Sequence, residues 1–344
     1  MARHGGDWMG YRIEYGAEPL DFSASVSPLG VPETVQAALR DAAGACDRYP
    51  DPLCRELCAA IAAKEGVEPS QVLCGGGASD LIYRMAYAAK PKRALVTAPC
   101  FGEYEAALAA AGCEVVRWAL DGSFRLDAGV LDALDGSLDL VILCQPNNPS
   151  GVSVDPALLR EIVSRAACRV AVDECFVDFL DQPEAYTMTR ALAAHENLLV
   201  LKALTKSHAL AGARLGWALC ADAAFLDAMR RAGAPWAVSS LAQAAGLAAL
   251  RDTAYLARVR ELVRTERAWL YGELCSLGLR IVAGEANFLL FRCDTPLDEP
   301  LRERGILLRG CGDFAGLDES FYRVAVRTHE DNLRLIAAIG EVLP

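Results

Sequence analysis

Four polar residues stand at the ends of apolar segments and could together carry out amine chemistry. Lys206 follows the apolar segment 197–204, Arg214 comes eight residues later, and Asp173 and Asn148 follow other apolar segments. A lysine amine can form a Schiff base, and an aspartate can pair with a protonated pyridine nitrogen. An asparagine can hydrogen-bond a phenolate oxygen, and an arginine can hold a phosphate through two parallel hydrogen bonds. Together these side chains predict a site for pyridoxal 5'-phosphate.

Taken singly, each of these residues has an ordinary explanation. A lone lysine is usually a surface charge, and a lone aromatic residue such as Phe101 is usually part of a core. The combination of Lys206 with Asp173, Asn148 and Arg214 is what favours the cofactor. With that cofactor in place, Phe101 could stack on its ring.

Three consecutive glycines at positions 75–77 follow an apolar run and precede a predicted helix. Such glycines allow close approach, and the free amides of Ala78 and Ser79 would attract a phosphate. The same turn can equally serve to pack a helix on a strand. A dinucleotide-binding turn is a further alternative, but it needs an acidic residue at the end of the next strand, where segment 98–100 contains none. The dinucleotide interpretation therefore loses its main support.

Short, almost continuously apolar segments alternate with helix-like segments rich in Ala and Leu. Continuous apolarity is typical of strands buried on both faces of a parallel sheet, so the alternation predicts an α/β fold with a mainly parallel central sheet. Because ligands bind at the carboxyl ends of such strands, the polar residues would meet at one edge. The expected strands are 71–74, 93–99, 113–120, 138–145, 168–175, 197–203 and 216–221, and the expected helices are 79–89, 101–111, 156–167 and 223–231.

The pattern changes after Pro235. Two long helical segments, 239–251 and 253–277, lead to shorter apolar segments and a final helix at 330–343. We expect a large cofactor-binding α/β domain at 41–235. Residues 1–40 and 236–344 would form a small α+β domain, with an N-terminal segment that closes over the substrate.

The composition narrows the class of protein. Of 344 residues 53% are hydrophobic, and the net charge is −11, which argues against a disordered chain, a nucleic-acid partner or an anionic membrane surface. No segment approaches the ~18 apolar residues of a membrane span, and the N-terminus lacks the apolar core of a signal peptide. The 13 cysteines are scattered without a metal-binding spacing. We therefore expect no metal site and a cytoplasmic location.

Several motifs resemble those of the fold type I, aspartate-aminotransferase-like pyridoxal-phosphate enzymes. They are PNNPSG at 146–151, VDECF at 172–176, LTK at 204–206 and ARLGW at 213–217. Within that group the chain is most similar to the threonine-phosphate decarboxylases of cobalamin biosynthesis, with the histidinol-phosphate aminotransferases close by. That similarity is carried by HGGD at 4–7, LDFSASVSPLG at 20–30, DRYPDP at 47–52, APWAVSSLA at 234–242 and the segment 306–327.

The resemblance implies a role for each matching residue. Lys206 would form the Schiff base and carry protons. The implied cofactor ligands are Asp173 at the pyridine nitrogen, Asn148 at the ring oxygen, Phe101 against the ring, and Arg214, Thr205, Ala78 and Ser79 at the phosphate. Tyr49 would reach the cofactor phosphate of a neighbouring subunit, which implies a homodimer. Arg323 would bind the substrate carboxylate and Arg309 the substrate phosphate. His4 and Ser27 would lie in the segment that closes over the substrate. The ordinary alternative for the two arginines is that they face solvent, as strand arginines usually do.

The implied activity is decarboxylation of L-threonine O-3-phosphate to (R)-1-amino-2-propanol O-phosphate for cobamide synthesis, with L-serine O-phosphate as a variant substrate. The alternative is an aminotransferase that uses the same site, such as a histidinol-phosphate aminotransferase. A non-enzymatic scaffold protein is a further alternative, but such a protein would be expected to lack Lys206 or Asp173, and both are present. Phe176 stands where the aminotransferases usually have tyrosine and so favours the decarboxylase. Three positions depart from the pattern: Ser25 and Ser27 replace asparagines, and Ala203 replaces a hydroxyl residue.

Overall fold

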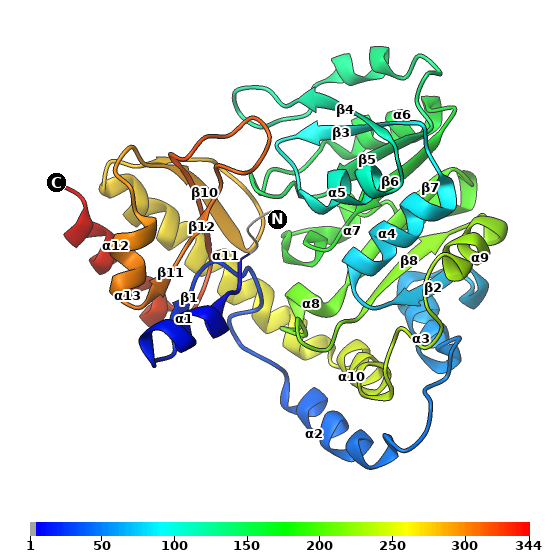
Figure 1. The fold of residues 1–344 in the computed structure, drawn as a ribbon, viewed down its shortest axis with the longest axis horizontal. Helices are drawn as coiled ribbons and strands as arrows, with labels where there is room; N and C mark the ends of the chain where they lie inside the picture. Colours follow the sequence, from blue (N-terminus) through cyan, green and yellow to red (C-terminus); the bar gives the residue numbers. More distant parts are fainter. Residues whose placement is uncertain (1–4) are drawn as a thin grey trace.

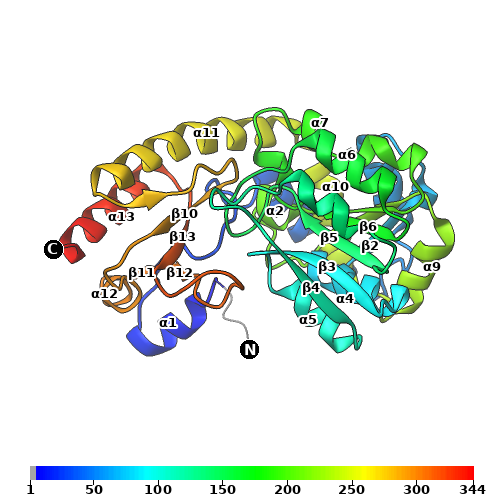
Figure 2. The same ribbon diagram turned by 90° about the horizontal axis from the view of Figure 1, so that it is seen from above.

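The computed structural model describes residues 5–344, which form two lobes (Figure 1). The larger lobe is built around a seven-stranded sheet and the smaller lobe around a four-stranded one. The long helix α11 (Thr253–Ser276) runs from one lobe toward the other, as the view in Figure 2 shows. The predicted α/β architecture with a second, smaller α+β part is confirmed.

The seven-stranded sheet contains every strand expected from the large-domain sequence. In spatial order its strands are β2 (Val72–Gly75), β8 (Gly216–Cys220), β7 (Leu198–Ala203), β6 (Arg169–Asp173), β5 (Leu140–Cys144), β3 (Arg93–Ala98) and β4 (Glu114–Ala119). All neighbours are parallel except β8, which is antiparallel to both β7 and β2. The connection from β7 to β8 holds only the short helix α8 (Leu204–Ser207), whereas a parallel crossover usually contains a longer helix that packs on the sheet.

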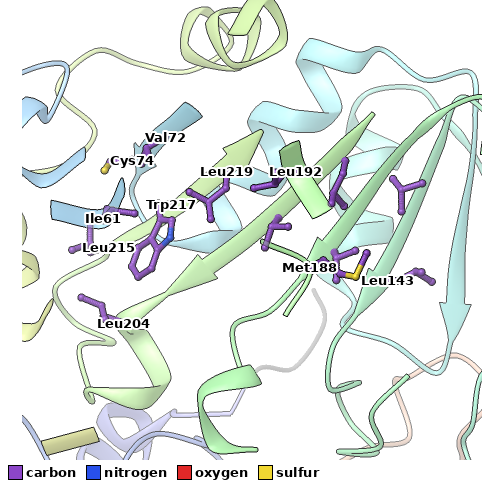
Figure 3. Packing of buried hydrophobic residues seen from close by; sticks show 14 of the residues in the cluster. Ile61, Val72, Cys74, Leu143, Met188, Leu192, Leu204, Leu215, Trp217 and Leu219 are labelled. Carbon is purple, nitrogen blue, oxygen red and sulfur yellow. The ribbon is translucent and has the colours of Figure 1, made fainter. Parts of the chain in front are cut away.

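Helices cover both faces of this sheet. One face carries α4 (Ala78–Ala89), α5 (Glu103–Ala110) and α9 (Ala223–Arg231), and the other carries α3 (Arg55–Glu65), α6 (Pro156–Arg165) and α10 (Ser240–Arg251). Alternate residues of each strand enter the two cores: Val141 and Leu143 face one core, Leu140 and Ile142 the other. Figure 3 shows the core on the face covered by α3, α6 and α10, to which Val141 and Leu143 belong and where Trp217 packs among aliphatic side chains. Burial on both sides explains why the strands read as unbroken apolar runs.

The four-stranded sheet of the small lobe is antiparallel. Its order is β12 (Arg309–Gly310), β13 (Phe321–Ala325), β10 (Phe288–Arg292) and β9 (Arg280–Ile281). Helices α11, α12 (Asp298–Glu303) and α13 (His329–Val342) pack around it. In the β12–β13 pair Arg309 is directly opposite Arg323, so the two side chains share one face of the sheet.

The N-terminal part is more regular than its sequence suggested. It contains α1 (Trp8–Tyr15), the two-residue strand β1 (Leu20–Asp21) and α2 (Glu33–Ala42), and β1 pairs in parallel with β11 (Ile306–Leu307). Helices α2 and α10 pack on the large-lobe core through Val35 and Ala245. The domain division at 41–235 remains a proposal. Helix α10 and all but the last two residues of α2 lie outside that range, yet both helices pack on the larger lobe.

The remaining helical segments are short. They are α7 (Pro183–Tyr186) and the 3-10 turns η1 (Ala43–Ala45), η2 (Pro69–Gln71), η3 (Ala128–Ala133), η4 (Val177–Phe179) and η5 (Thr189–Ala194). Among residues 5–344, no helix is both long enough and apolar enough to cross a bilayer.

Candidate active site

Lys206 lies in α8, at the edge of the large sheet that faces the small lobe. Its Nζ is 5.5 Å from the centre of the Phe176 ring. Burial, with a further contribution from the Arg323 guanidinium, lowers the pKa of Lys206 to about 8. At pH 7 about one tenth of this amine is therefore uncharged, which is the form that acts as a nucleophile.

Asp173 is the last residue of β6 and is buried. The Tyr104 hydroxyl donates to its Oδ2 at 2.7 Å, and the Cys175 amide donates to its Oδ1 at 3.0 Å. Burial, and then the Asp173 carboxylate, hold the pKa of Tyr104 well above its usual value, so the hydroxyl keeps its proton. Sequence reasoning missed Tyr104; the only available signal is its position one helical turn beyond Phe101.

Phe101 leads into α5 and meets the edge of the Tyr104 ring, with 5.6 Å between centroids and 87° between planes. The carboxyl end of β3 and that of β6 lie on the same edge of the sheet, because these strands run in the same direction. Phe101 and Asp173 are therefore joined through one tyrosine, which packs on the first and hydrogen-bonds the second.

The glycine turn and Arg214 form one cradle. Gly77 has φ +94° and caps α4, and a Cβ at this position would lie 2.6 Å from Nη2 of Arg214. A Cβ at Gly216 would lie 2.8 Å from the amide nitrogen of Ala78. No side chain caps the helix, so the amides of Ala78 and Ser79 remain directed outward at its positive end. The residue types here suit a phosphate.

Arg323 and Asn148 connect the two lobes. Arg323 is buried and donates through Nη1 to Oδ1 of Asn148 and through Nη2 to the Ser23 carbonyl at 3.1 Å. Its Nε is buried without a hydrogen-bond partner among the residues described. Since Asn148 accepts from Arg323 through its oxygen, its amide NH₂ is the group left to donate to a ligand.

Arg309 lies beside Arg323 and is also buried. Its Nη2 is 2.9 Å from the Asp313 carboxylate, its Nη1 donates to the Gly310 carbonyl, and its guanidinium lies over the Phe314 ring at 5.0 Å. The two strand arginines are therefore buried and do not extend into solvent, as arginines on strands usually do. Arg323 and the Arg309–Asp313 ion pair lie side by side in the small lobe.

The segment around Ser27 touches the lysine turn. The Ser27 amide donates to the Lys206 carbonyl at 2.7 Å, and its hydroxyl shares a hydrogen bond with that of Tyr255 at 2.7 Å. Ser25 is buried, and its hydroxyl has no hydrogen-bond partner within residues 5–344. His4, predicted to lie in the same closing segment, is outside the described residues.

Two predicted residues have different surroundings. Thr205 is half-buried in α8 next to Lys206, at the cradle end of the sheet. Tyr49 is 82% exposed and stacks on Trp236, with 4.8 Å between ring centroids. Within residues 5–344 nothing encloses Tyr49, so this side chain is accessible to another subunit.

The described residues fit the predicted cofactor. A partly uncharged amine, a buried carboxylate and a Cβ-free cradle with an arginine lie at one sheet edge, with an aromatic side chain nearby. No cluster of His, Cys, Asp or Glu suited to a metal ion occurs among residues 5–344.

Comparisons with known proteins agree with this geometry. The chain is 40% identical to "Threonine-phosphate decarboxylase" of Salmonella typhimurium, covering 99% of this chain and 96% of that protein. It is 32% identical to "Histidinol-phosphate aminotransferase" of Methanothermobacter thermautotrophicus, covering 95% and 89%.

A solved structure shares the fold. It is histidinol-phosphate aminotransferase from Sinorhizobium meliloti in complex with pyridoxal-5'-phosphate, with a TM-score of 0.88 at 23% identity, covering 99% of this chain and 95% of that one. The family described as "Aminotransferase class I and II" matches residues 17–339. Both lobes and every site residue described above except those before residue 17 lie within that match, so the chain belongs to the aminotransferase class I and II family.

Proposed function

We propose that this protein is a pyridoxal-phosphate-dependent lyase that decarboxylates L-threonine O-3-phosphate to (R)-1-amino-2-propanol O-phosphate. L-Serine O-phosphate, which lacks one methyl group, is a variant substrate that such a site would discriminate by only about 1–3 kcal/mol. The 40% identity to a threonine-phosphate decarboxylase over nearly the whole of both chains supports this reaction.

The observation that carries the proposal is the pair of buried arginines opposite Lys206. Arg309 and Arg323 are buried on one face of adjacent strands, so a ligand that binds both would carry two anionic groups besides an amine. A phospho-amino acid has a carboxylate and a phosphate and meets this demand. Arginine binds both groups through paired hydrogen bonds.

When bound, pyridoxal phosphate supplies an aldehyde that condenses with an amine and a ring that accepts the electron pair left when a bond at Cα breaks. Lys206 would hold its aldehyde, Asp173 its ring nitrogen and Asn148 its ring oxygen. Phe101 would lie against the ring, and Arg214, Thr205 and the amides of Ala78 and Ser79 would hold its phosphate. The Asp173 carboxylate would keep the nitrogen protonated, and the hydrogen bond from Tyr104 holds that carboxylate in place.

The arginines decide which bond at Cα breaks. Arg323 would bind the carboxylate and Arg309 the phosphate, which fixes the rotation of the substrate about Cα. That rotation would hold the bond from Cα to the carboxylate, and not the Cα–H bond, in the position from which it can break. Carbon dioxide leaves, and the ammonium form of Lys206, which the lowered pKa makes a stronger acid, would supply the proton that Cα receives.

An aminotransferase is the second candidate, because a histidinol-phosphate aminotransferase is 32% identical over 95% of this chain. The same residues would then hold the Cα–H bond perpendicular to the ring, and a keto acid would receive the amino group. Phe176, which packs against Phe288 at 5.0 Å and faces Lys206, offers no hydroxyl to the ring oxygen.

A single assay separates the two reactions. The purified protein is incubated with pyridoxal phosphate and L-threonine O-3-phosphate in the absence of any keto acid. We expect release of carbon dioxide and formation of the amine phosphate. Turnover that requires 2-oxoglutarate and releases no carbon dioxide would establish the aminotransferase instead.

We further propose that the active form is a homodimer in the cytoplasm. Tyr49 and Trp236 form an exposed aromatic pair, and Tyr49 would extend to the cofactor phosphate of the second subunit. All thirteen cysteines are free thiols, which suits a reducing compartment.

A further inference from the structure

We propose that Asp313 is an intramolecular competitor for Arg309, a carboxylate that a ligand phosphate must displace and that returns when the product leaves. The inference extends the proposed function, because it takes Arg309 as the residue that receives the phosphate of the substrate. Asp313 contacts Arg309 and acts through it, so it is a positioning residue that sets how tightly the site holds an anion.

The geometry of the ion pair supports this role. Nη2 of Arg309 is 2.9 Å from the Asp313 carboxylate, and the side chains are 9% and 31% exposed, respectively. The other side of the guanidinium is occupied by the Gly310 carbonyl and the Phe314 ring. The carboxylate thus takes donors of Arg309 that would otherwise be available to a ligand.

The surrounding charges make the competition strong. Arg323 lies directly across from Arg309, so two buried guanidinium groups repel one another in a site with little water. Asp313 offsets this repulsion in the absence of ligand. An incoming phosphate takes over the same task but first has to break the existing pair, and the binding affinity is reduced by that cost.

The two anionic groups of the substrate give the competition a consequence for turnover. The substrate is held by both arginines, but after loss of carbon dioxide the product keeps only its phosphate. Arg309 is then the remaining strand arginine that retains the product, and the return of Asp313 to Arg309 displaces it. A site built without this carboxylate would hold its product longer.

The test measures binding of 2-phosphoglycolate to the cofactor-loaded protein by titration calorimetry. This probe carries a carboxylate and a phosphate but no amine, so it cannot react with the aldehyde. In Asp313→Asn we expect the dissociation constant to fall about tenfold, because one charge-assisted contact no longer competes. The KM for L-threonine O-3-phosphate falls with it. Damage to the fold would weaken binding, so a gain in affinity separates competition from a structural role.

Two controls sharpen the result. Asp318→Asn removes the same charge from the same loop, but Asp318 hydrogen-bonds Ser320 and does not contact Arg309, so no gain is expected. In an Arg309→Gln background, Asp313→Asn should give no gain. Should Asp313→Asn fail to fold, Asp313→Ser is measured in its place with the same expectation.

Unchanged or weaker binding in Asp313→Asn, or an equal gain in Asp318→Asn, would overturn the inference. The outcome does not depend on the reaction that the enzyme catalyses. If no carbon dioxide is released from the phospho-amino acid but Asp313→Asn still binds phosphoglycolate more tightly, the proposed function fails and the competition stands.

Discussion

At the scale of single residues, two ionisable side chains of the site have pKa values shifted from their ordinary values. Burial leaves Lys206 partly uncharged, and a tyrosine that retains its proton holds the carboxylate of Asp173. Neither effect needs a ligand, because both arise from packing within the chain. The amine and the carboxylate are therefore prepared before the cofactor arrives.

The lowered pKa of Lys206 predicts the pH dependence of cofactor loading. The amine attacks the aldehyde only when uncharged, so the loading rate should rise about tenfold between pH 7 and pH 9 and level off above the pKa of about 8. A lysine with an ordinary pKa would give about a hundredfold rise without a plateau. The measurement is the rate at which the yellow absorbance of the bound cofactor appears after mixing at each pH.

Tyr104→Phe should weaken cofactor binding by about tenfold or more, because Asp173 loses a hydrogen bond from a buried donor, worth roughly 1.5–3 kcal/mol. The pH at which the absorbance of the bound cofactor changes should also shift, since Asp173 is less well held against the ring nitrogen. Both quantities come from spectrophotometric titration. Tyr322→Phe is the control: it removes a buried hydroxyl that accepts from the Leu297 amide in the small lobe, and cofactor binding should not change.

At the scale of secondary structure, the junction between β2 and α4 has the features of an anion site. The strand ends at the sheet edge, the glycines turn the chain, and the helix begins without a capping side chain. Arg214 then fills the space that a side chain on Gly77 would take. The cradle needs both the positive φ of Gly77 and the absence of a Cβ at this position.

Gly77→Ala should therefore lower the affinity for pyridoxal phosphate by more than tenfold, with a stability loss of about 1 kcal/mol from the left-handed backbone. Gly112→Ala is the matched control. Gly112 also has a positive φ, +76°, but a Cβ there would meet nothing within 4 Å. Equal losses of cofactor affinity in the two variants would show that Gly77 serves the backbone alone.

At the scale of the whole molecule, the small lobe brings two arginines to a lysine that the large lobe supplies. The contacts between lobes include Arg323 with Asn148, and the N-terminal segment bridges both through Ser23 and Ser27. Tyr49, by contrast, lies exposed on the large lobe, where a second copy of the chain would have to reach it.

Mixed dimers test whether Tyr49 completes the site of a neighbour. Lys206→Ala and Tyr49→Ala proteins should each be nearly inactive, whereas refolding them together should restore roughly a quarter of the wild-type activity through one intact site per mixed dimer. Activity is measured as carbon dioxide release. Mixing Lys206→Ala with Arg214→Ala should restore none, because both residues belong to the same subunit's site. Absence of recovery in the first mixture would contradict the shared site.

The sequence predicted the large sheet well because most of its strands are buried on both faces and are therefore almost continuously apolar; the edge strand β4 is the exception. It missed the antiparallel direction of β8 and the two-residue strand β1, since neither direction nor so short a pairing leaves a pattern. Lys206, Asp173 and Arg214 could be recognised by type and position. Tyr104 and Asp313 could not be recognised, because the role of each depends on one side-chain contact in the folded protein. The sequence does not show that contact, and Tyr and Asp occur at many positions that have no such role.

The pairing of β2 with β8 has a consequence for how the protein acquires its cofactor during folding. These strands come from distant parts of the chain, yet Gly75 pairs directly with Gly216. Contacts between residues so far apart in the sequence form slowly, because a long loop must close first. Far-ultraviolet circular dichroism should thus recover early during renaturation, while the ability to retain the vitamin-derived coenzyme returns only with the final ordering of the sheet margin.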